Sequence, residues 1–153
     1  MSERIDAFEE ALQIVRGLLT TDGFTFEGRH FSVTDATLQP RCVQQPTPPI
    51  WVGASGERRM LPIVARHADV WHCSGPPSVL AAKSRVLDEL CERSDRDPAS
   101  LRRAASLSLE GGTDSVRRAI DAFTDAGFSY LVCGWPSQGR DRIEAFAASV
   151  FTD

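Results

Sequence analysis

From residue 50 onward the sequence alternates between short apolar runs and amphipathic stretches, and this alternation most strongly limits the fold. Short apolar runs are typical of buried strands, whereas apolar residues spaced three or four apart indicate helices. Strands joined by helices run parallel, because the helix returns the chain to the edge where the previous strand began. We predict four such units, with strands at residues 50–52, 70–72, 105–109 and 128–133 and helices at 57–67, 78–93, 113–126 and 141–150.

The number of units allows two architectures. A closed barrel has eight strand–helix units and about 250 residues, whereas this chain has 153 residues. From the pattern alone, the units form either part of an α/β barrel or a small open sheet. In both, one helix face packs on the sheet, and for the helix at 78–93 we expect that face to contain Val79, Val86, Leu87 and Leu90.

The first 49 residues do not follow this alternation. Residues 1–22 have apolar side chains at helical spacing, and residues 24–33 alternate between apolar and polar around a Glu27-Gly28 turn, as a β-hairpin does. Residues 39–49 contain four prolines, which exclude a helix or a central strand. We therefore expect one partial barrel domain over residues 1–153, made of a helix (1–22), a hairpin insertion with a proline-rich connector (23–49) and four β/α units (50–153).

The turn after the first predicted parallel strand is a candidate anion site. The strand ends in small residues and a helix is predicted to follow at once, so backbone N–H groups and the helix N-terminus could hold a phosphate. A tight turn without a ligand needs the same residue types, and the residues alone leave both interpretations open. The turn fits neither a P-loop nor a dinucleotide-binding glycine motif. Its residues are Gly53, Ala54, Ser55, Gly56 and Glu57.

A second candidate site follows the next predicted strand, where His72, Cys73 and Ser74 stand at the strand end. In a barrel this edge binds ligands. His72 could hydrogen-bond a ligand or exchange protons near neutral pH, although a structural histidine explains it equally simply. Cys73 has no recognisable base beside it in the sequence. We find no metal-binding pattern and can name no catalytic residue; Lys83, the only lysine, lies within a predicted helix and offers no Schiff-base site.

Charge and composition exclude several partner classes. The net charge is −4 and the basic residues are scattered among acids, which argues against nucleic acid as a partner. The apolar runs are too short to cross a bilayer, and the charged N-terminus is unlike a signal peptide, so we expect no membrane association. The four cysteines form no Cys-x-x-Cys pair and are expected to be free thiols of a cytoplasmic protein.

Taken in order, several segments resemble the C-terminal part of the luciferase-like monooxygenase superfamily. The resemblance extends from Arg4 to about Val132, and no single segment is diagnostic without the others. The segments are the helix at residues 4–15, the Phe26-Glu-Gly-Arg-His-Phe31 hairpin, Gln45-Pro-Thr-Pro-Pro-Ile-Trp-Val-Gly53, Ala65-Arg-His-Ala-Asp-Val-Trp71, Gly112-Thr113 and Ala126-Gly-Phe128.

The resemblance implies a fold, a cofactor and a reaction class. The family fold is a (β/α)8 barrel, so the four units would be its C-terminal half, preceded by a helix and the hairpin insertion. The cofactor would be FMN or coenzyme F420, the substrate a small organic molecule, and the reaction a monooxygenation or a hydride transfer. The resemblance also favours the phosphate interpretation of the turn. The implied cofactor-binding residues are Gly53, Ala54, Ser55, Gly56, the N–H of Glu57, His72, Cys73 and Ser74.

The missing barrel units leave two hypotheses for how such a chain works. In the first, the chain is a truncated oxidoreductase that keeps the site for the cofactor phosphate. In the second, it is a non-catalytic half-barrel that self-associates, because a sheet cut from a barrel exposes two strand edges and an apolar inner face. On either hypothesis we expect a homo-oligomer formed through the exposed sheet edges.

Overall fold

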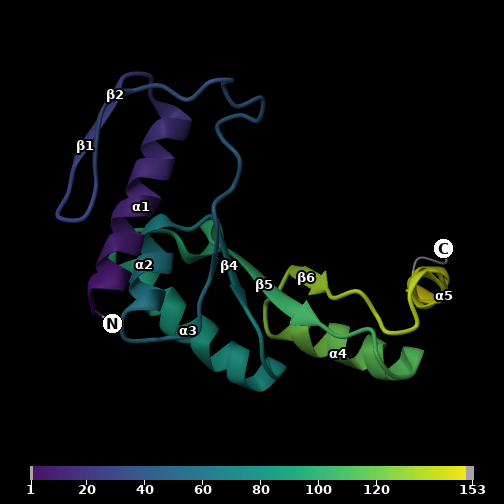
Figure 1. Ribbon diagram of the computed structural model, residues 1–153. Coiled ribbons are helices and arrows are strands. Elements are labelled where there is room, and N and C mark those ends of the chain that lie inside the picture. The colour runs from purple at the N-terminus through teal and green to yellow at the C-terminus, as the bar shows by residue number, and fades with distance from the viewer. Residues whose placement is uncertain (1, 151–153) are drawn as a thin grey trace.

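A computed structural model describes residues 2–150, and it divides them into a helix with a hairpin and a larger α/β unit (Figure 1). Helix α1 (Ser2–Thr20) is followed by the antiparallel hairpin of β1 (Phe24–Glu27) and β2 (Ser32–Ala36). The hairpin lies alongside α1, and an extended connector leads from it to the sheet (Figure 1). The predicted helix, hairpin and proline-rich connector are therefore confirmed.

Four parallel strands form the main sheet in the order in which they occur in the chain. They are β3 (Trp51–Gly53), β4 (Val70–Cys73), β5 (Arg102–Leu107) and β6 (Tyr130–Cys133). Each is followed by a helix: α2 (Met60–His67), α3 (Pro77–Arg93), α4 (Thr113–Asp125) and α5 (Arg140–Val150). The short 3-10 helix η1 (Pro98–Ser100), capped by Asp97, precedes β5. Sequential parallel order with one helix per strand is the arrangement of a barrel wall.

Contacts between the two outer strands show that the sheet is strongly curved. Trp51 begins β3 and Tyr130 begins β6, yet their ring centroids are 5.2 Å apart in an edge-to-face contact. In a flat sheet, side chains standing three strands apart would be separated by about 14 Å. The Arg102 guanidinium lies over the same tyrosine ring, 5.7 Å from its centroid. The curvature therefore supports the barrel interpretation over the open sheet, and the C-terminal half-barrel fold is confirmed.

The core lies between the convex face of the sheet and the helices. Trp71 is fully buried at its centre and contacts Phe128, which also meets Phe123 of α4. Burial of such large apolar side chains stabilises the fold at roughly 25 cal/mol per Å² of apolar surface removed from water. The remaining large, fully buried side chains of this core are Leu61, Val64, Leu80, Leu87, Leu101 and Cys91.

Helix α1 is joined to the sheet by a carboxylate that precedes β4. The Asp69 Oδ2 atom accepts hydrogen bonds from the Arg16 guanidinium at 2.8 Å and from the backbone N–H of Ile50 at 2.7 Å. Arg16 also donates to the His67 carbonyl at 3.1 Å. One carboxylate thus connects α1, the start of β3 and the α2–β4 turn.

The hairpin is held to α1 by Glu10. Its carboxylate accepts hydrogen bonds from the backbone N–H groups of Arg29, His30 and Phe31, at 2.8 to 3.0 Å. Desolvation acts to raise the pKa of Glu10, but the three N–H donors outweigh it and the pKa is lowered. The hairpin turn therefore depends on an ionised carboxylate from another element.

Several predicted boundaries and part of one predicted helix face differ from the structure; β6, for example, begins at Tyr130 rather than residue 128. Helix α2 begins at Met60 rather than residue 57, because residues 57–59 form a turn. The Gly56 carbonyl, just before this turn, accepts the N–H groups of Met60 and Leu61. Strand β5 begins at Arg102 rather than residue 105. In α3, Val79 is 48% exposed, and Leu80 occupies the buried position expected for it. Among the described residues, no helix is long and apolar enough to cross a membrane.

Candidate functional site

The two predicted site segments meet at the carboxyl ends of β3 and β4. The strands pair in parallel with Gly53 opposite His72, which brings the loops that follow them side by side. A hollow of about 450 Å³ opens between these loops. It is lined by Gly53, Ala54, Ser55, Gly56, Met60, His72, Cys73 and Ser74. Seven of the eight predicted site residues therefore line one hollow, while Glu57 lies outside this lining.

The carbonyl groups from Ala54 to Gly56 in the β3–α2 turn each accept a hydrogen bond from the protein. The Ala54 carbonyl accepts a hydrogen bond from the indole N–H of Trp71 at 2.8 Å. The Ser55 carbonyl accepts one from Lys83 Nζ at 2.9 Å. The Gly56 carbonyl accepts the backbone N–H groups of the first two residues of α2, both at 3.0 Å. Four hydrogen bonds from three elements thus fix which way these peptide groups face.

Three successive N–H groups of the same turn have no acceptor among residues 2–150. The Ala54 N–H donates to the His72 carbonyl at 3.1 Å. Within residues 2–150, the N–H groups of Ser55, Gly56 and Glu57 have no acceptor. Successive N–H groups without acceptors beside the N-terminus of a helix form a partial positive charge. An arrangement of this kind can accept an anion.

The glycines keep the main chain of the turn accessible. A Cβ atom added at Gly53 would meet no atom within 4 Å, and one at Gly56 would meet only the Met60 side chain at 3.8 Å. Packing therefore does not require glycine at either position. Small residues at open positions allow a ligand to approach the backbone closely.

A hydrogen-bonded group of side chains lies beside the turn on the concave face of the sheet. His72 Nε2 is 3.1 Å from the Ser106 hydroxyl, and Ser74 Oγ is 2.8 Å from the same hydroxyl. Ser106 belongs to β5, and sequence reasoning did not identify it. The signal that could have found it is its position on the strand next to His72, two residues beyond the register partner of that histidine.

Cys73 differs from its neighbours in being buried. Its side chain is 5% exposed, it belongs to the hydrophobic core, and its thiol donates weakly to the Ser74 carbonyl at 3.8 Å. This position suits a packing residue. Within residues 2–150, no group of three His, Cys, Asp or Glu side chains is arranged to hold a metal ion.

Lys83 is a further site residue that the sequence did not indicate. From the middle of α3 its ammonium group reaches Glu57 Oε1 at 2.8 Å in addition to the Ser55 carbonyl. The Lys83 side chain is 20% exposed and that of Glu57 is 48% exposed. The Glu57 side chain is thus turned toward α3, which explains its absence from the lining of the hollow.

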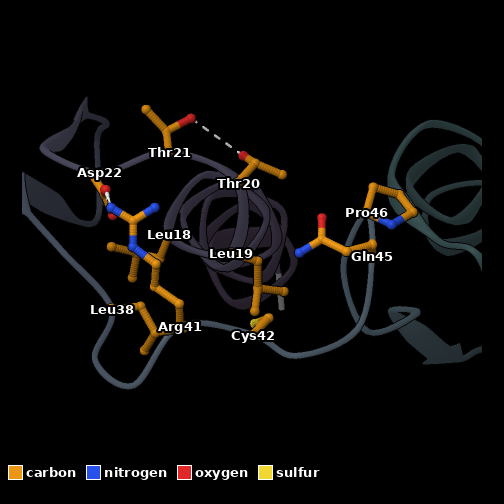
Figure 2. Close-up of a pocket in the computed structure, with 10 residues that line it drawn as sticks. All are labelled: Leu18, Leu19, Thr20, Thr21, Asp22, Leu38, Arg41, Cys42, Gln45 and Pro46. Carbon is orange, nitrogen blue, oxygen red and sulfur yellow. Dashed lines mark hydrogen bonds and ion pairs between the residues drawn. The ribbon is translucent and has the colours of Figure 1, made fainter.

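A second hollow of about 330 Å³ lies between the end of α1 and the connector (Figure 2). Figure 2 shows Arg41 paired with Asp22 and the Thr20 and Thr21 hydroxyls in contact, at 3.4 Å. The apolar part of its wall is formed by Leu18, Leu19 and Leu38. It contains none of the predicted site residues and no acid–base pair beyond that ion pair.

Comparison with known proteins identifies the family to which this chain belongs. The sequence matches the luciferase-like monooxygenase family over residues 1–115. That is well over half of the 153 residues, and the chain belongs to this family. The family expected from the ordered sequence segments is therefore confirmed.

Individual relatives are similar over only part of their own length. An FMNH2-dependent dimethylsulfone monooxygenase of Pseudomonas putida is 34% identical over 86 residues, which are 56% of this chain and 23% of that enzyme. The pyrimidine monooxygenase RutA of Enterobacter sp. (strain 638) is 29% identical over 146 residues, 92% of this chain and 39% of that enzyme. The chain thus spans less than half the length of these relatives.

Solved structures share the fold. The coenzyme F420-dependent tetrahydromethanopterin reductase of Methanopyrus kandleri superimposes with a TM-score of 0.75 at 14% sequence identity. The superposition covers 93% of this chain and 60% of the reductase. At this identity the likeness establishes the fold alone.

Proposed function

We propose that this chain provides the phosphate-binding part of a flavin- or F420-dependent oxidoreductase that acts on a small organic substrate. The observation that supports it most directly is the β3–α2 turn, in which every carbonyl from Ala54 to Gly56 is engaged and the N–H groups of Ser55, Gly56 and Glu57 are free. Such a turn attracts an anion. FMN and coenzyme F420 both contain a phosphate group.

Family membership supplies the cofactor class. The similar enzymes are FMNH2-dependent in one case and F420-dependent in another, and the turn fits the phosphate of either cofactor. The Gly56 and Glu57 N–H groups and the Ser55 hydroxyl would donate to phosphate oxygens. The open glycine backbone would permit that approach. The bound cofactor would supply the redox chemistry, while the protein supplies binding and orientation.

The polar group on the concave face would meet the rest of the ligand. His72, Ser74 and Ser106 form one hydrogen-bonded set beside the turn. A histidine and two hydroxyls can each donate or accept, so the set can orient a polar cofactor tail or substrate. We assign these residues a binding role and include the predicted Cys73 as part of the wall of the hollow.

Titration of the purified chain with FMN and with riboflavin, which lacks the phosphate, tests the proposal. We expect FMN to bind at least about tenfold more tightly, the effect of one or two charge-assisted hydrogen bonds. Gly53→Leu should abolish this preference, because its side chain would enter the open hollow without disturbing the fold. Gly112→Leu is the matched control, since a Cβ there also meets no atom within 4 Å but lies outside the site. F420 is titrated in the same way. Equal binding of FMN and riboflavin by the wild-type chain would refute the proposal.

A second candidate function is self-association of a non-catalytic half-barrel. It is favoured by the concave face of the sheet, where Trp51, Tyr130 and Val132 are exposed. Within the described residues, β3 and β6 each pair along one edge only. Apolar patches and open strand edges both promote association. Light scattering over a concentration series tests it: a constant monomer mass at high concentration would contradict it.

A further inference from the structure

The β3–α2 turn carries one charge that would oppose phosphate binding, and this is the starting point for a further inference. Glu57 contributes its N–H to the turn, but the same residue has a carboxylate. A carboxylate close to a phosphate repels it strongly where water is partly excluded. A turn that holds phosphate must therefore neutralise this side chain or direct it elsewhere.

Lys83 does both. Its ammonium group is 2.8 Å from Glu57 Oε1, and it lies in α3, outside the lining of the hollow. The carboxylate is thus paired on the side of the turn that faces α3. Lys83 is the only lysine in the chain. Its side chain is mostly buried, so solvent screens this ion pair less than a pair between fully exposed groups.

The second contact of Lys83 sets the direction of a donor. The ammonium group also holds the Ser55 carbonyl at 2.9 Å. In a planar trans peptide the carbonyl of one residue and the N–H of the next point in opposite directions. Because the Ser55 carbonyl faces Lys83, the Gly56 N–H points away from α3. One side chain thus controls both the charge and the orientation of the turn.

We propose that Lys83 is the positioning residue of the phosphate turn: it neutralises Glu57 and turns the Ser55–Gly56 peptide so that the Gly56 N–H faces the ligand. The role is indirect, because Lys83 itself does not line the hollow. This inference rests on the proposed phosphate-binding function, and it names the group in the neighbouring β/α unit on which that function depends.

The test compares FMN with riboflavin in four proteins: the wild type, Lys83→Met, Glu57→Gln and the double variant. Lys83→Met should weaken FMN binding by about tenfold or more, because it leaves a carboxylate unpaired beside the phosphate, and should leave riboflavin binding unchanged. In the double variant that carboxylate is gone, so part of the FMN affinity should return. Glu57→Gln alone should bind FMN as well as the wild type or better.

Two controls separate positioning from folding and from overall charge. Arg140→Met removes one cation from the exposed ion pair with Glu144 and should change the binding of neither FMN nor riboflavin. Urea unfolding verifies that each variant is folded. If Lys83→Met is not folded, Lys83→Gln replaces it in the comparison of FMN and riboflavin binding. Amide NMR provides a readout without cofactor: inorganic phosphate should shift the Gly56 resonance in the wild type and much less in Lys83→Met.

The outcomes distinguish this inference from the proposed function. If the wild type prefers FMN and Lys83→Met keeps the full preference, the inference is wrong and the phosphate site stands. An equal loss of FMN and riboflavin binding, or no recovery in the double variant, also overturns it. If the wild type shows no preference for FMN over riboflavin, the proposed function fails and the inference fails with it.

Discussion

Substitution of Asp69 tests how α1 is attached to the sheet. Asp69→Ala removes the acceptor for the Ile50 N–H at 2.7 Å and for the Arg16 guanidinium at 2.8 Å. A hydrogen bond to a charged group contributes about 1.5–3 kcal/mol, while a partly exposed ion pair adds about 1 kcal/mol or less. The Arg16 and Asp69 side chains are 36% and 33% exposed, so the ion pair belongs to the weaker class. We expect Asp69→Ala to lower the free energy of unfolding by about 2–3 kcal/mol.

Two further variants assign this loss to its parts. Asp69→Asn keeps an oxygen for the Ile50 N–H and removes only the ion pair, so it should cost about 1 kcal/mol. Arg16→Met should cost a similar amount, and a double-mutant cycle between the two positions measures their coupling. The assay is urea unfolding followed by circular dichroism. If Asp69→Ala unfolds within 0.5 kcal/mol of the wild type, a level typical of unimportant surface positions, the argument from these bonds is refuted.

Three other predictions concern the turn, the hairpin and α3. Trp71→Phe loses the indole bond to the Ala54 carbonyl and leaves a cavity at a fully buried position, so it should lower the free energy of unfolding by about 2 kcal/mol or more; an unchanged urea midpoint would mean that neither the bond nor the packing of the indole stabilises the fold. The pKa of Glu10 is lowered in the folded state, so its contribution to stability is present above the unfolded value of 4.5 and is lost as pH falls through the folded value. Unfolding measured between pH 6 and 3 should therefore show a weaker acid dependence in Glu10→Gln, and identical pH profiles would contradict this. Leu80→Ala should cost about 2–5 kcal/mol, whereas Val79→Ser should change stability by less than about 0.5 kcal/mol; the reverse order would show that α3 buries the predicted face.

Local pattern was sufficient for the order of the elements and for the family. The helical spacing at residues 4–15, the Glu27-Gly28 turn and the alternation after residue 50 are signals within short windows. Each pattern indicates secondary structure that depends mainly on neighbouring residues, and the structure confirms the predicted helix, hairpin and strand–helix units. The location of the candidate turn also followed from local residue types, because small residues between a strand and a helix are visible in the sequence.

Interactions between distant residues could not be predicted in the same way. The start of β5 was missed because Arg103 is an unusual residue for a buried strand position, and it is accommodated by Asp88 and Ser84 of α3. Neither partner is recognisable from sequence spacing. For the same reason Lys83 was seen only as a helix residue, since its two partners are 26 and 28 residues away. In α3 the buried face differs at one predicted position: Leu80 is buried where Val79 was expected, while Leu87 is buried as expected. Val86 and Leu90 are partly buried and pack against the core.

The contact between Trp51 and Tyr130 joins the two outer strands of the sheet across its concave face. An edge-to-face pair of this kind contributes about 0.5–1.5 kcal/mol, so outward movement of β6 would have to break it and would release the indole on β3. A further strand or a second copy that docks along one edge and moves it would therefore disturb this contact at the opposite edge. Such an event would change the surroundings of Trp51, one of the three tryptophans in the chain.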